Sequence, residues 1–201
     1  MTVPAIAAST IAQQAFREME LSPLNSFDDD SEQAQAAAEQ YPEALGLVLE
    51  TADWSFASVL AELSASDLPL GSAVDATLPY FYAPPGDAVK VRECGPERQN
   101  IRWRRDRDGL RSEQAPPLRL RYTAMIADET QTSASFRLAV ALQLAILLAP
   151  RWLGTATKID ALKRNFEMKL KKAQREDARN ASDARYDNQP ETEDWANGST
   201  W

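Results

Sequence analysis

Hydrophobic positions in the first quarter of the chain follow a helical period. Apolar side chains recur on one side between residues 5 and 20, which predicts an amphipathic helix. Pro23 ends this helix, because a proline disfavours helical geometry in the residue before it. A second pattern of the same period predicts another helix over 31–53, which Pro42 should kink or split.

Three consecutive acidic residues, Asp28, Asp29 and Asp30, lie directly before the second predicted helix. Acidic side chains complement the positive end of a helix dipole, and Asp30 with Gln33 matches a capping box. The alternative is a metal site built from these carboxylates, but no second cluster of ligands accompanies them. We therefore favour the capping interpretation.

The period of the pattern changes to two between residues 88 and 123. Apolar residues alternate there with basic ones, which predicts three strands that share an apolar face and a basic face. The basic positions are Lys90, Arg92, Arg102, Arg104, Arg119 and Arg121. Asp108-Gly109 adds a strong hairpin signal, because the turn that matches strand twist needs positive φ. We expect a small antiparallel β-meander over 88–123.

The segment 133–149 is apolar on nearly every side, which is typical of a helix in the middle of a helical layer. Its most apolar stretch runs from Leu138 to Ala149 and is closed by Pro150. This stretch is well short of the roughly 20 residues that span a bilayer. We therefore expect a core helix rather than a membrane anchor.

The last predicted helix, over 157–181, carries a narrow apolar stripe between charged sides. Two acid–base pairs have the favourable i,i+4 spacing: Asp160 with Arg164, and Glu167 with Lys171. We expect a surface helix whose polar face is solvated.

Together these elements predict a mainly α protein with a small antiparallel β region, built as a bundle of about four helices plus the β-meander. Residues 1–181 should form a single domain, since 201 residues suffice for one domain with a real core. The segment 182–201 is polar apart from Trp195 and Trp201, a composition that does not fold alone. We expect an extended C-terminal docking arm with these tryptophans as partner-binding anchors.

Charge is segregated along the chain, whose formal net charge is −8. Residues 1–87 carry one basic residue against fourteen acidic ones, whereas residues 88–122 carry ten basic against five acidic. Opposite charge blocks indicate contacts between copies or with partners. The candidate partner-binding residues here are Arg102, Arg104, Arg119 and Arg121, and plain solvation of these arginines is the alternative.

The residue inventory leaves few routes to catalysis. The chain has no histidine and one cysteine, Cys94, which excludes the usual hydrolase triads, most zinc sites and an internal disulfide. None of the seven glycines lies in a phosphate-binding loop motif. We therefore expect no enzyme activity, no metal and no cofactor. The first residues lack the basic cluster and apolar run of a signal peptide, so the expected compartment is the cytoplasm.

Arginine-rich strands that contain an aromatic residue, here Trp103, also occur in nucleic-acid-binding modules. Two observations weigh against that function. The chain is acidic overall, and Trp103 alternates with the arginines and so points to the opposite face. A protein-contact face is favoured.

Several motifs occur in a distinctive order along the chain. They are a helix with an acidic proline loop at 15–29, Trp54-Ser55-Phe56 after the second helix, a Pro-Pro-Gly-Asp entry into a strand at 78–91, Leu120-Arg121-Tyr122, and an Ala/Leu helix that begins near Phe136. Spread over roughly 5–185, this order resembles the tail tubular protein A family, the head-to-tail adaptors of short-tailed phages. Pro42 and the tryptophan-bearing tail depart from the family pattern.

The resemblance implies a structural adaptor with no catalytic role. Twelve copies would form a ring under the portal protein, around a channel through which genomic DNA passes without sequence-specific binding. The ring would provide the docking site for the next neck or tail protein. The expected location is the virion neck, reached by assembly in the host cytoplasm and without a membrane. The alternatives are a stopper or tail terminator, a nucleic-acid-binding protein, or a metal-dependent enzyme built on Asp28–Asp30.

Overall fold

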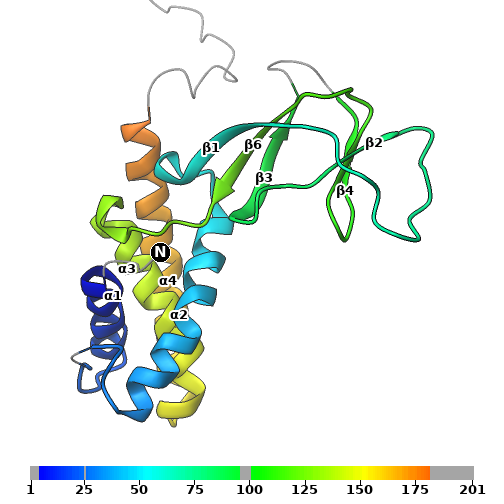
Figure 1. Cartoon of the computed structure of the whole chain (residues 1–201). Helices are drawn as coiled ribbons and strands as arrows, with labels where there is room; N and C mark the ends of the chain where they lie inside the picture. Colours follow the sequence, from blue (N-terminus) through cyan, green and yellow to red (C-terminus); the bar gives the residue numbers. More distant parts are fainter. Residues whose placement is uncertain (1–4, 25, 96–100, 182–201) are drawn as a thin grey trace, which may run out of the picture.

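The structure, a computed structural model, describes residues 5–24, 26–95 and 101–181. Four helices stand together as a bundle, and two small antiparallel sheets form a lobe that projects sideways from one end of it (Figure 1). The predicted combination of four helices with a small antiparallel β region is confirmed. The predicted C-terminal arm, with Trp195 and Trp201, lies outside the described residues, and the single domain over 1–181 stays a prediction.

The first two helices occupy the predicted segments. Helix α1 (Ala5–Glu18) ends before Pro23, and α2 (Glu32–Thr51) begins after Ser31, whose Oγ accepts a hydrogen bond from the Ala34 N–H at 3.1 Å. The predicted Asp30 cap is wrong, because Ser31 holds the extended backbone from which its short side chain reaches that N–H. Pro42 lies inside α2 without splitting it, and its ring is exposed while the opposite side of the helix is buried.

Helix α3 (Ala134–Trp152) lies at the centre of the bundle and packs against α1, α2 and α4. The predicted end at residue 149 is wrong, because Pro150 falls inside the last turn and the Leu153 N–H still donates to the Ala149 carbonyl at 2.7 Å. Among the described residues, α3 alone is long and apolar enough to cross a membrane. Nine of its side chains are buried against the other helices, as expected for a core helix.

Helix α4 (Ala156–Asn180) runs alongside α3 and buries only Leu162, Ala173 and Asp177. Neither of the two predicted i,i+4 ion pairs forms; within the described chain, α4 has one internal pair, Lys172 with Glu176 at 3.6 Å. Exposed ion pairs gain little free energy over hydration, so the i,i+4 spacing alone does not enforce them.

The strands do not form the predicted meander over 88–123. One sheet has the order β1-β6-β3 and the other β2-β5-β4. The first sheet contains β1 (Ser58–Leu63), β6 (Leu118–Ala124) and β3 (Ala88–Cys94), and the second contains β2 (Tyr80–Tyr82), β5 (Leu110–Ser112) and β4 (Trp103–Arg105). The meander fails because β4 pairs with β5 instead of β3, and because β6 pairs with β3 on one side and on the other with β1, which lies outside 88–123.

A hairpin joins β4 and β5 at Asp108-Gly109, as predicted, but neither residue has the positive φ on which the prediction rested. The Asp106 N–H donates to the Gly109 carbonyl at 2.9 Å and closes the turn. Gly109 is required by space, because a Cβ there would come within 2.6 Å of the Phe81 ring and of the Tyr82 carbonyl oxygen. The β4–β5 hairpin is thereby packed tightly against β2.

Candidate interaction surfaces

Two of the candidate arginines, Arg102 and Arg104, lie on or next to β4 in the second sheet. The Arg102 Nε pairs with Glu113 at 2.8 Å, and Arg104 pairs with Asp106 at 2.6 Å and with Asp75 at 3.3 Å. The backbone N–H and side chain of Arg102 hold the pKa of Glu113 below its usual value. Both cations are exposed but already matched by nearby carboxylates.

The other two candidates, Arg119 and Arg121, lie two residues apart on β6, in the first sheet. Arg119 stands opposite Glu62 of β1, and Arg121 pairs with Glu93 at 3.0 Å and also with Asp53. Both arginines are half-buried. The predicted single basic face is therefore wrong: the four arginines divide between two sheets, because β4 and β6 are not neighbours. Their role in partner binding stays a prediction.

Arg92 of β3 joins the lobe to the bundle. Its Nε donates to the Thr123 Oγ1 at 2.7 Å, and one of its terminal nitrogens donates to the carbonyls of Leu49, at 3.1 Å, and Ala52. These carbonyls end α2 and have no partner within the helix, and a cation there also complements the helix dipole. Burial lowers the pKa of Arg92. The sequence pattern marked Arg92 only as one more basic position.

Arg111 of β5 is a buried cation that the sequence analysis missed. Its side chain is 7% exposed, and its Nε pairs with Asp106 at 2.7 Å. One terminal nitrogen donates to the Ala73 carbonyl at 2.9 Å, whereas the other, Nη1, is buried without a partner. The guanidinium therefore fixes the long β1–β2 loop, residues 64–79, against the second sheet.

The β1–β2 loop is braced at further points and presents apolar side chains to solvent. The Ser66 N–H donates to the Phe81 carbonyl at 2.8 Å, and a turn is closed between Ser72 and Pro69 at 2.9 Å. Gly71 in this turn has φ +84°, a geometry that glycine adopts without strain. Leu70, beside it, is fully exposed, and the exposed fraction of Val74 is 73%. The sequence had indicated only a loop here.

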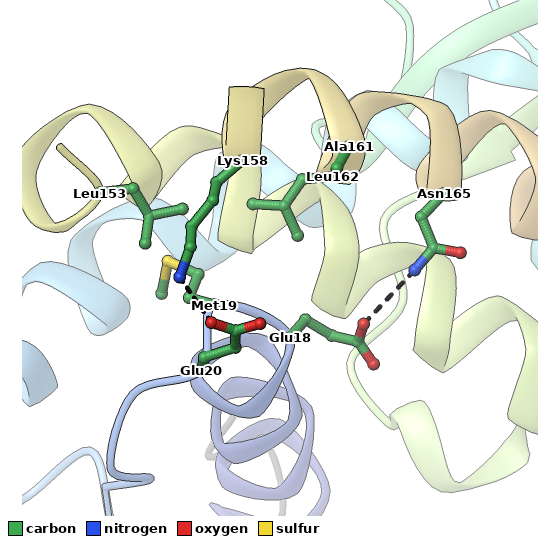
Figure 2. Close-up of a pocket in the computed structure, with 8 residues that line it drawn as sticks. All are labelled: Glu18, Met19, Glu20, Leu153, Lys158, Ala161, Leu162 and Asn165. Atoms are coloured by element: carbon green, nitrogen blue, oxygen red, sulfur yellow. Dashed lines mark hydrogen bonds and ion pairs between the residues drawn. The ribbon is translucent and has the colours of Figure 1, made fainter. Parts of the chain in front are cut away.

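A small pocket lies where the end of α1 meets the α3–α4 connection (Figure 2). Its polar residues bind one another: Lys158 pairs with Glu20 at 2.5 Å, and the Asn165 amide donates to Glu18 at 3.4 Å. The volume is about 160 Å³, below the roughly 300 Å³ at which ordinary ligand pockets begin. This pocket offers no acid–base or nucleophilic arrangement.

The metal and cysteine chemistry of the described chain is equally sparse. Within its three described ranges, no group of three or more Cys, Asp or Glu side chains is placed to hold a metal ion. Cys94 is buried in the lobe, and burial raises the pKa of its thiol to about 12. The thiol is therefore protonated at neutral pH and unreactive.

Searches with family models and among curated proteins found no match to this chain.

Proposed function

We propose that this protein is a structural head-to-tail adaptor of a tailed phage, which forms a ring under the portal protein. The observation that carries the proposal is the lobe that projects from the bundle (Figure 1). Its braced loop holds Leu70 and Val74 out in solvent at the far side from the helices. A ring subunit must contact a copy on each side, and a projecting lobe can supply one of these two contacts. The order of motifs over 5–185 supports the same function.

The work of such an adaptor is binding. Twelve copies surround a channel for the genomic DNA, which passes without sequence-specific contacts, and the lower face of the ring receives the next neck or tail protein. Ring geometry multiplies modest contacts, so a few docked side chains per subunit make a durable joint. No cofactor enters this function, and its place is the neck of the virion.

The ion pairs of the lobe favour a protein contact over DNA binding. Proteins bind free DNA through Lys and Arg side chains that neutralise its phosphates and release the counterions held there. Arg102, Arg104 and Arg121 instead already have carboxylate partners at or below 3.3 Å. We accordingly expect no strong salt-dependent binding of free DNA.

The direct test is to mix the purified chain with the portal protein of the same virus and to analyse the mixture by sedimentation and electron microscopy. We expect the chain alone to sediment as a small species and to form rings on the portal. Binding to tail tubes but not to portal would identify a tail terminator instead. Tight, salt-sensitive binding of free DNA by the chain alone would overturn the proposal in favour of a nucleic-acid-binding protein.

A second test addresses the arm at 182–201. Truncation after Arg185 and the double change Trp195→Ala with Trp201→Ala should both weaken portal binding, because a docked aromatic anchor contributes about 2 kcal/mol or more. Circular dichroism should show unchanged helix content in both variants. If the truncated chain joins heads to tails as well as the full chain does, the arm has no docking role.

A further inference from the structure

The β1–β2 loop combines an apolar centre with an acidic rim. Leu70 and Val74 are its exposed apolar residues, and the exposed Asp67 precedes Leu70 by three positions in the same loop. The loop, 64–79, has two acidic residues and no basic one, and Asp75 is already paired with Arg104. Asp67 therefore leaves the loop suited to a surface that carries a positive charge beside an apolar centre.

The outward side of α4 has the opposite character. Met168 is 64% exposed and lies across the helix from the buried residues Leu162 and Ala173. Helical spacing places Arg164 and Lys171 next to Met168 on the same side. Both cations are exposed, and neither has an ion pair with a described residue. This stripe offers an apolar centre with a basic rim.

One copy of the chain cannot bring these two surfaces together. The loop lies at the far side of the lobe, whereas α4 belongs to the bundle (Figure 1). A contact between two different surfaces of identical copies is heterologous, and it generates a closed ring when the rotation between copies closes. The complementary charge and the paired apolar centres make a second copy the fitting occupant of the α4 stripe.

We propose that the β1–β2 loop of each subunit docks on the α4 stripe of the next, with Leu70 against Met168 and Asp67 beside Lys171. This inference rests on the proposed function in that copies of the chain form a ring. It goes further by assigning the two surfaces that make the ring.

Cysteine cross-linking tests the contact in the full chain. Leu70→Cys and Met168→Cys are prepared separately, mixed with portal protein of the same virus or at high concentration alone, and oxidised. A disulfide needs Cα atoms within about 7 Å, so it reports only direct contact. Native Cys94 is buried and does not interfere. We expect covalent dimers from the mixture and none from either variant alone. Leu60→Cys, at a 54% exposed position on β1, replaces Leu70→Cys in the control and should give no dimer with Met168→Cys.

The outcomes separate this contact from the proposed function. Rings on the portal without the 70–168 cross-link overturn the contact and leave the adaptor function standing. The cross-link at high concentration, without portal binding, supports the contact and contradicts the adaptor function. Absence of both overturns both. Dimers from one single variant would indicate a symmetric contact and would also overturn the inference.

Charge exchange sharpens the assignment. Asp67→Lys and Lys171→Glu should each weaken subunit association about two- to five-fold, as expected for an exposed ion pair, and the two changes together should restore it. The matched control is Lys163→Glu, which makes the same charge change on a different side of α4. Equal weakening by Lys163→Glu, or no recovery in the double variant, would contradict the pairing.

Discussion

Among the described residues, 26 buried apolar ones form the core of the helical bundle, whereas seven form the core of the β-lobe. The bundle core includes an aromatic cluster in which Trp54, Phe56 and Phe136 pack within 5.8 Å of one another, centre to centre. The lobe instead relies on charged side chains, with Arg111 buried in its second sheet and Arg121 paired to two carboxylates. Non-directional burial stabilises one region and directional polar contacts stabilise the other.

This difference relates stability to function. A small core gains little hydrophobic stabilisation, because that term scales with the apolar area removed from water. A lobe that docks on a neighbouring copy buries further area only in the assembly. We therefore infer that the bundle is the stable scaffold of the subunit and that the lobe is the part whose stability depends on its partners.

The largest expected effect is in the bundle. Trp54 is fully buried, packs edge-to-face on Phe136 at 5.0 Å and donates from its Nε1 to the Val48 carbonyl at 3.0 Å. Trp54→Ala should lower the free energy of unfolding by about 3–5 kcal/mol, measured by urea denaturation. Trp103→Ala, on the exposed strand β4, is the control and should cost about 0.5 kcal/mol or less. Equal losses would contradict the division into scaffold and dependent lobe.

The same division explains what the sequence could predict. Helical periodicity lies within a few consecutive turns, so all four helices were found to within a few residues of their ends. Pairing in the lobe is non-local: Ser58 of β1 lies opposite Thr123 of β6. Strand β5 is three residues long and buried throughout, with Arg111 at its centre, so it shows no alternation. Local patterns carry no signal for such a strand.

The candidate site was predicted to a smaller extent. The alternation placed Arg119 correctly in a strand and Arg102 one residue before a strand, but it does not reveal which strands are neighbours. Arg111 was missed, because an arginine buried against Asp106 and a loop carbonyl has no sequence pattern of its own. The exposed Leu70 was missed for a related reason: its exposure depends on how the whole loop is braced.

The next largest effect should come from Arg111→Leu. The substitution removes the donor to the Ala73 carbonyl and leaves Asp106 with Arg104 as its remaining cation. Lost hydrogen bonds at a buried site cost about 1–3 kcal/mol. We expect the loss to be local, so amide hydrogen exchange in the β1–β2 loop should accelerate while the helices keep their protection. Arg105→Leu, at an exposed neighbouring position, should change neither.

A smaller effect is expected where the segment between α2 and β1 contacts α4. Asp177 of α4 accepts hydrogen bonds from the Ser55 backbone N–H at 2.9 Å and from the Ser55 Oγ at 2.5 Å. Asp177→Asn removes the charge from this pair of bonds and should lower stability by about 1–2 kcal/mol, measured as a shift of the thermal midpoint. Glu176→Gln, at the neighbouring exposed ion pair, should cost less than about 0.5 kcal/mol. Equal shifts would show that the contact between Asp177 and Ser55 contributes no more stability than an exposed ion pair.

The smallest expected effect is a dependence of the lobe on pH. Three of its carboxyl groups have a pKa below the usual value: Asp75 through a hydrogen bond from Thr77, Asp106 through one from Arg104, and Glu113 through bonds from Arg102. All three groups are near the surface, where water and salt screen the interaction, so each contributes little. In the bundle, Lys158 lowers the pKa of Glu20 in the same way.

A carboxyl whose folded-state pKa is lowered stabilises the fold fully above its unfolded pKa, and the contribution is lost as the pH falls through the folded value. The lobe should therefore loosen below about pH 4, where ordinary carboxyl groups take up protons, while the bundle core stays packed. The difference in fluorescence between the unchanged chain and the variant Trp103→Phe isolates Trp103 from the other four tryptophans. Its change over pH 7 to 2.5, compared with the change in helix ellipticity, reports the lobe and the bundle separately. Arg104→Gln should reduce the change in Trp103 fluorescence between pH 7 and 2.5. Simultaneous transitions in both signals would show that lobe and bundle unfold as one unit.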